Sequence, residues 1–259
     1  MELELPRLAS EQVSAFMLTL ARVGGLFALA PVFSARAVPA RARAVLAMAI
    51  AFALLPAATA SGDVPVEAFA FAGVLLKEVL VGLAFAFALS ALVAGLQLGA
   101  GVIDSAVGFS FAQIVDPFSN VQGAVLGQVY ALFAAIVLVL TGGDQLMLMG
   151  LAHTYEVVPL DGLPSAASFG ELALTVFGRV FVIGLEVVAP VLIAVLVVDA
   201  ALGIVARAAP QMNVFVVGLP AKILTALAMI AASLPFVARH VTHELEVSVV
   251  QALTTLGIR

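Results

Sequence analysis

The stretch FGELALTVFGRVFVIGLEVVAPVLIAVLVVDAALG, residues 169–203, decides the fold class of this chain. It holds 35 mostly apolar residues, whereas an α-helix needs about 20 apolar residues to cross the hydrocarbon core of a bilayer. Similar runs lie at about 12–33, 44–60, 66–101, 124–141 and 213–235. We therefore predict an all-α integral membrane protein with about six long apolar helices, arranged as helical hairpins.

The composition excludes a water-soluble fold. Hydrophobic residues make up 64% of the chain and charged residues 10%, whereas soluble domains average about 45–50% and about 25%. The mean hydropathy is +1.22. The absence of cysteine excludes disulfides and thiolate metal sites. The net charge is −5 and the longest basic cluster is Arg36, Arg41 and Arg43, so we expect no nucleic-acid partner.

The positions of the charges outside the apolar runs predict the topology. An acidic segment precedes the first run, whereas a secretory signal needs a basic one, so this run is predicted to remain as a transmembrane helix. Arginines lie between the first and second runs and between the fifth and sixth. The positive-inside rule places these two loops in the cytoplasm. Both termini are then expected on the outer side.

Two of the runs, 66–101 and 169–203, are longer than one simple crossing requires. At ~1.5 Å per residue, a straight helix over either run approaches ~50 Å. Either these helices break, as Pro190 would allow in the fifth run, or they extend beyond the lipid into a protein assembly.

Seven ionisable residues lie inside the apolar runs. They are Arg22, Lys77, Glu78, Arg179, Glu186, Asp199 and Lys222. Facing lipid, the seven would together cost roughly 20 kcal/mol. We therefore expect them to be paired, to lie near an interface, or to face neighbouring protein or water. A proton relay is the alternative, although the histidines lie outside the apolar runs.

The connector between the third and fourth runs, residues 101–122, is apolar but poorly periodic: GVIDSAVGFSFAQIVDPFSNVQ. Irregular backbone at membrane depth is tolerated only inside protein or along a water-filled cavity. The connector is therefore either a re-entrant, pore-blocking loop or an amphipathic interfacial hairpin. GxxxG patterns at 95–99 and 123–127 flank it and indicate tight helix packing, within the chain or between subunits.

The segment RAAPQMNVFVVGLPAK, residues 207–222, joins the fifth and sixth runs. Pro210 and Gln211 indicate a turn, and Pro220 and Lys222 enter the next apolar run, so the pattern predicts the tip of a helical hairpin. After Pro235, apolar residues repeat every four positions and predict an amphipathic tail helix, lying on a surface or packed against a partner. Two histidines in this tail are too few for a metal site.

We find no phosphate-binding loop, HExxH motif, nucleophile elbow or carboxylate cluster in the sequence. The sequence therefore predicts a non-enzymatic protein without a cofactor or metal.

The string ARAAPQMNVFVVGLPAKI, residues 206–223, resembles a conserved segment of the FliR family, the flagellar relatives of the SctT subunit of injectisomes. Two further strings support the resemblance, ARVGGLFALAPVFSARAVPARAR at 21–43 and GFSFAQIVDP at 108–117. It covers most of the chain and is least informative at 144–170 and after 236.

The resemblance implies a subunit of the flagellar type III export gate in the bacterial inner membrane, within the flagellar basal body. One copy would assemble with FliP and FliQ subunits into a helical complex and contact an FlhB-type subunit, passing unfolded export substrates. Residues 1–165 would be FliP-like, with a plug loop at about 104–122. Residues 166–259 would form a FliQ-like hairpin and the tail.

The resemblance also assigns site residues. Those of the plug or pore loop are Gly108, Phe109, Phe111, Gln113, Asp116 and Pro117. Those of the hairpin tip are Arg207, Pro210, Gln211, Asn213, Phe215, Gly218, Pro220 and Lys222. The embedded charges would then face neighbouring subunits instead of lipid.

A secondary transporter is the rival interpretation. In that case Glu186, Asp199 and Lys222 would form a midplane ion-coupling site beside proline-broken helices. An intramembrane hydrolase is a third class, but the sequence offers no convincing nucleophile and base.

Overall fold

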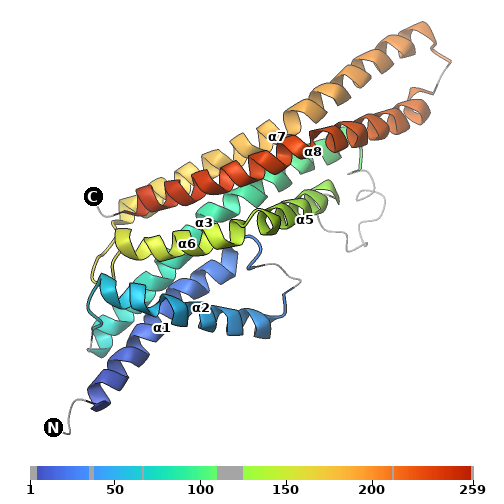
Figure 1. Cartoon of the computed structure of the whole chain (residues 1–259). Coiled ribbons are helices and arrows are strands. Elements are labelled where there is room, and N and C mark those ends of the chain that lie inside the picture. The colour runs from blue at the N-terminus through green and yellow to red at the C-terminus, as the bar shows by residue number, and fades with distance from the viewer. Residues whose placement is uncertain (1–4, 35–37, 66, 110–124, 212, 258–259) are drawn as a thin grey trace. The chain divides into compact units, whose positions relative to one another are not determined.

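The computed structural model describes residues 5–34, 38–65, 67–109, 125–211 and 213–257, and the regular structure in these ranges is helical throughout (Figure 1). The helices are α1 (Leu5–Leu29), α2 (Ala40–Ser61), α3 (Ala68–Val107), α5 (Val125–Leu140), α6 (Gly143–Val157), α7 (Ala166–Ala208) and α8 (Val214–Leu256). Five of them, α1, α2, α3, α7 and α8, are long and apolar enough to span a membrane. The predicted all-α integral membrane class is confirmed.

Helix α6 is absent from the six predicted runs. Residues 143–157 include Asp144, His153 and Glu156, which reduce the hydropathy of a segment that is only 15 residues long. Together α5 and α6 are apolar enough for a sixth span, but they meet at a 75° bend. Gly142 lies at this break with a positive φ of 75°, a conformation that glycine adopts without strain.

One of the two alternatives for the fifth run and the predicted end of the sixth run are wrong, and both involve proline. Pro190 lies inside α7, which is a continuous helix. The alternative in which the fifth run breaks at this proline is therefore wrong. Pro220 and Pro235 lie inside α8, which continues to Leu256. The tail is therefore part of α8. Proline removes one helical hydrogen bond, and in membrane helices neighbouring groups compensate for that loss.

The chain divides into two compact units. The first comprises Met1–Ala91, Leu138–Val176 and Glu244–Arg259, and the second comprises Leu92–Val137 and Phe177–His243. Helices α3, α5, α7 and α8 contribute residues to both.

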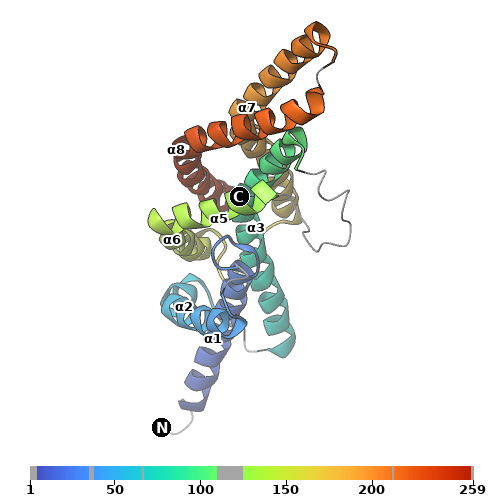
Figure 2. The same cartoon turned by 90° about the vertical axis from the view of Figure 1, so that its right-hand side faces the viewer.

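In the first unit, α1 packs beside α2 (Figure 2) and crosses α3 at a pair of glycines. A Cβ on Gly82 would overlap the Arg22 carbonyl oxygen, and a Cβ on Gly25 would lie 2.5 Å from Leu83 N. The backbones of α1 and α3 are therefore in direct contact. Because Gly82 is one helical turn from Glu78, this contact also brings Arg22 close to Glu78.

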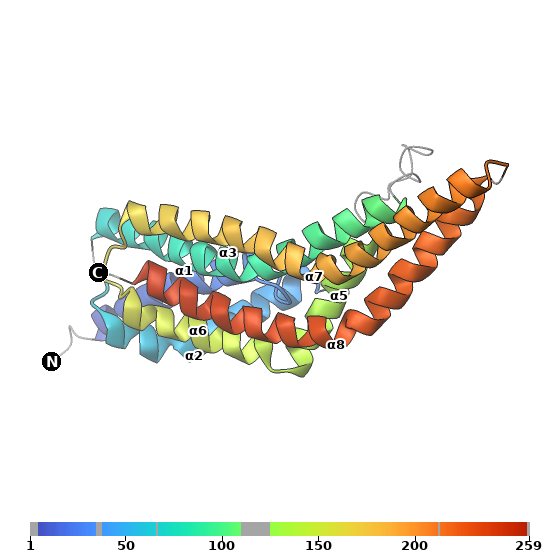
Figure 3. The same ribbon diagram turned by 90° about the horizontal axis from the view of Figure 1, so that it is seen from above.

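The end of α8 packs inside the first unit, against α6 (Figure 3). Leu245 lies beside Gly143 and Val249 beside Gly150, and both apolar side chains are buried. The periodicity after Pro235 correctly predicted a helix with one apolar face. The expectation that this face meets a surface or another protein is wrong, because α6 covers it.

In the second unit, α3 and α7 meet through small residues. A Cβ on Gly99 would lie 2.5 Å from Gly184 O, and one on Gly95 would lie 2.7 Å from Ile183 Cβ. The GxxxG pattern at 95–99 therefore serves packing within the chain. Gly123 of the second pattern lies outside the described residues.

Candidate functional site

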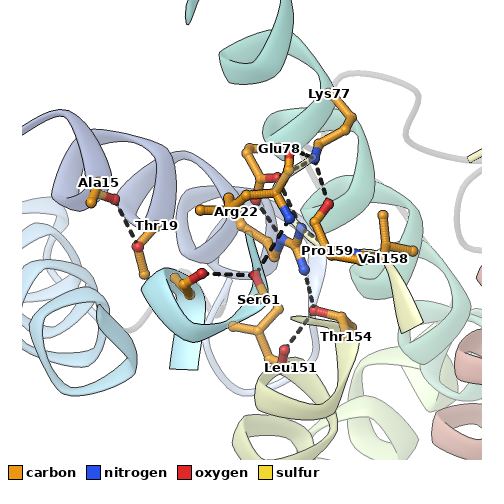
Figure 4. Close-up of polar contacts among 12 residues, drawn as sticks. Ala15, Thr19, Arg22, Ser61, Lys77, Glu78, Leu151, Thr154, Val158 and Pro159 are labelled. Atoms are coloured by element: carbon orange, nitrogen blue, oxygen red, sulfur yellow. Dashed lines mark hydrogen bonds and ion pairs between the residues drawn. The ribbon is translucent and has the colours of Figure 1, made fainter. Parts of the chain in front are cut away.

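A buried ionic cluster occupies the contact between α1 and α3 in the first unit (Figure 4). Arg22 donates to both carboxylate oxygens of Glu78, from Nε to Oε2 at 2.5 Å and from Nη2 to Oε1 at 2.9 Å. Both side chains are fully buried. This two-point geometry is the strongest form of an arginine–carboxylate pair.

Arg22 also reaches α6 and the residues that follow it. Nη1 donates to Thr154 Oγ1 at 3.0 Å and Nη2 donates to Val158 O at 2.9 Å. The guanidinium carbon lies 3.9 Å from the centre of the Tyr155 ring, a cation–π distance. One side chain on α1 therefore connects three segments that are far apart in sequence.

Lys77 completes the cluster from the other side of Glu78. Its Nζ lies 3.0 Å from Glu78 Oε1 and donates to Pro159 O at 2.8 Å and to Leu160 O at 2.7 Å. The three N–H groups of the ammonium are thereby matched by three oxygens. The two cations also lie at the C-terminal end of α6, where the helix dipole favours positive charge.

The arrangement explains how three charges are tolerated in apolar helices. Lys77 and Glu78 are 5% and 0% exposed, and each charge has an opposite charge or carbonyl oxygens within hydrogen-bond distance. Four N–H groups of Arg22 and the ammonium of Lys77 have acceptors, and both oxygens of the Glu78 carboxylate are used. The chemistry of the cluster is therefore structural: it fixes α1, α3 and residues 158–160 to one another.

The second unit contains the end of the α7–α8 hairpin (Figure 1). Arg207 lies in the last turn of α7, where a positive charge is favourable, and its side chain is exposed. Pro210 and Gln211 form the turn, and Asn213 O and Oδ1 both accept from Val216 N, at 3.0 and 3.4 Å. The predicted hairpin tip is thus a tight turn with exposed polar groups.

An ion pair lies two turns from this tip. Lys222 Nζ on α8 is 2.5 Å from Asp199 Oδ1 on α7, and both side chains are partly exposed. A cavity of about 350 Å³ lies beside the pair and is also lined by Ser105 and Gly108 from the end of α3. Gly218 packs against Leu202, while Pro220 is exposed. The Phe215 side chain lies outside the described part.

The other embedded charges of α7 lie apart from this pair. Glu186 Oε2 is 3.3 Å from His240 Nε2 on α8, and Arg179 is half-buried. Glu186 and Asp199 are 13 residues apart on one helix, which corresponds to about 20 Å. The three residues of the transporter interpretation therefore belong to two separate pairs, Asp199 with Lys222 and Glu186 with His240.

The predicted plug loop is described only where it begins. Helix α3 continues to Val107, so residues 104–107, which were predicted as loop, are helical. Gly108 has a positive φ of 97° and Phe109 follows it in a turn. Four of the loop's predicted site residues lie outside the described residues: Phe111, Gln113, Asp116 and Pro117.

Sequence reasoning missed Asp104, which is 4% exposed and accepts a hydrogen bond from the Leu126 amide at 3.1 Å. It also missed Thr154, whose hydroxyl oxygen accepts a hydrogen bond from Arg22. The only local sign of Asp104 is an acidic residue in the last turn of an apolar helix, four positions before a glycine.

Comparison with known proteins identifies the family. The model of a family described as "Bacterial export proteins, family 1" matches residues 13–247. The chain belongs to this family.

Individual proteins also match this chain over most of their length. The chain is 32% identical to "Flagellar biosynthetic protein FliR" of Escherichia coli (strain K12) over 225 residues, 86% of this chain and 85% of that protein. It is 31% identical to the Bacillus subtilis (strain 168) protein of the same name over 219 residues, 83% and 84%. "Surface presentation of antigens protein SpaR" of Shigella sonnei matches at 31% over 174 residues, 66% and 67%. The resemblance to FliR is confirmed.

Proposed function

We propose that this chain is a non-enzymatic subunit of the flagellar type III export gate in the bacterial inner membrane. With FliP- and FliQ-type subunits it forms the gated channel for unfolded flagellar proteins, and its hairpin tip faces an FlhB-type subunit. The family match over residues 13–247 and the similarity to proteins named flagellar biosynthetic protein FliR support this proposal.

The observation that carries the assembly part of the proposal is the apolar surface of α7. Six large apolar side chains of α7 in the second unit are each at least 60% exposed: Phe177, Phe181, Leu185, Ile193, Val197 and Ile204. Helix α7 has 43 residues and so a length of about 65 Å, roughly twice the ~30 Å hydrocarbon core. Lipid covers only part of such a helix, and neighbouring subunits cover the rest.

The same proposal assigns residues 1–165 to a FliP-like part with the plug loop, and 166–259 to a FliQ-like hairpin with its tail. One copy of the chain enters each gate. The loop after Gly108 closes the channel, with Phe109 and Phe111 as the apolar seal. The positive φ of Gly108 supports a bend at this position, because other residues would be strained there.

Co-expression with FliP- and FliQ-type chains tests the assembly. We expect a stable hetero-oligomer with one copy of this chain, and purification of this chain alone from such co-expression contradicts the proposal. The transporter interpretation predicts substrate-stimulated uptake by this chain alone in liposomes. We expect none.

Deleting residues 109–113 from the assembled gate tests the loop. We expect ion conductance across a bilayer to rise well above that of the intact gate, because the apolar seal is lost. Deleting the five residues 161–165, which lie between α6 and α7, provides a control of equal length. Unchanged conductance in a fully assembled 109–113 deletion contradicts a pore-closing role.

A further inference from the structure

Asp104 lies where two helices of the second unit meet. Its carboxylate is nearly fully buried, and both oxygens approach the Leu126 amide, at 3.1 and 3.4 Å. Leu126 is the second residue of α5, so its N–H is one of the free donors of a helix N-terminus. The negative charge thus lies at the positive end of the α5 dipole. Asp104 acts as an N-terminal cap supplied by another helix.

The backbone of the same residue ends α3. Asp104 O accepts from Gly108 N at 3.1 Å and from Phe109 N at 2.9 Å. This is a common way to end a helix, with glycine in the left-handed region, and Gly108 has that conformation. Residue 104 therefore caps the end of α3 with its carbonyl and the start of α5 with its side chain.

From these contacts we propose that Asp104 is a positioning residue that holds residues 104–109 and 125–126 together as a closed neck. The end of α3 and the start of α5 therefore meet at this one residue. Without the carboxylate, the buried amide at the start of α5 has no described acceptor. The effect of the neck on channel closure rests on the proposed function, but the neck itself does not.

Hydrogen exchange of the purified full-length chain in detergent tests the neck directly. We expect Asp104→Leu to increase exchange at residues 125–128 about tenfold, because it removes the acceptor. Asp104→Asn keeps one carbonyl oxygen, so we expect a smaller but measurable increase of about two- to threefold. Asp144→Asn provides a matched control, because Asp144 lies in the first turn of α6 and should leave exchange at 125–128 unchanged.

Exchange in α1 reports whether each variant is folded. If Asp104→Leu does not fold, Asp104→Asn decides, and unchanged exchange at 125–128 in that variant overturns the proposal. Unchanged exchange in a folded Asp104→Leu variant does the same.

Conductance of the assembled gate separates the two proposals. We expect Asp104→Leu to leak several-fold more than Asp104→Asn, as a positioning role requires. If exchange at 125–128 increases and conductance stays at the closed level, the neck stands and the pore-closing role of the loop fails. If neither changes, the neck is wrong.

Discussion

Replacing Glu78 of α3 with glutamine should destabilise the protein more than neutralising Glu186 of α7. Glu78 receives two hydrogen bonds from Arg22 and one from Lys77, and bonds to charged groups are each worth about 1.5–3 kcal/mol. Glutamine keeps one acceptor oxygen, so part of this hydrogen-bond energy is retained. What it cannot replace is the counter-charge of two buried cations. Removing one partner of a buried ion pair costs about 3–5 kcal/mol, and we expect a loss of that size.

The free energy of unfolding of the purified chain, measured in micelles by steric trapping, checks this value. Glu186→Gln is the matched control, because Glu186 faces His240 but is 50% exposed. Exposed pairs contribute about 0–1 kcal/mol, so the control should change the free energy of unfolding by no more than that. A loss for Glu78→Gln below about 1 kcal/mol, equal to the control, refutes the view that the cluster fixes α1, α3 and residues 158–160.

Three further predictions concern packing and the hairpin tip. Gly82→Ala should lower the unfolding free energy by about 1–3 kcal/mol, because its Cβ meets the Arg22 carbonyl, whereas Gly73→Ala, with open space around it, should not. Leu245→Ala should cost about 2–5 kcal/mol in the same assay. Lys222→Leu and Arg207→Ala should reduce flagellar secretion in cells while membrane insertion, followed by fractionation, stays normal. Normal motility in both would contradict a role for the tip.

The helices were predictable because an apolar run is a local property of the sequence. The run at 169–203 predicts α7 without reference to any other segment. The helix end predicted at Pro235 was wrong for the opposite reason. Whether proline ends a helix depends on whether neighbouring groups replace the lost hydrogen bond. The four-residue repeat after Pro235 predicted the structure correctly, because it identifies the apolar face that packs against α6.

The site was predictable only as a set of residue types. That buried charges need partners follows from solvation energy alone. That Arg22 pairs with Glu78 and Thr154, 56 and 132 positions away, depends on which helices meet. Asp104 escaped notice for the same reason, because its partner at Leu126 belongs to a different helix.

The carbonyl groups that Lys77 requires are made late during synthesis of the chain. Pro159 and Leu160 follow Lys77 by 82 and 83 residues, so a ribosome adding about 5–20 residues per second supplies them roughly 4–16 s later. Until then, α1 and α3 hold two positive charges against one carboxylate. The N-terminal helices therefore enter the membrane with part of these hydrogen bonds missing, and α6 together with residues 158–160 supplies them later. We expect chains truncated before residue 160 to lack these acceptors and to be degraded as misfolded membrane proteins.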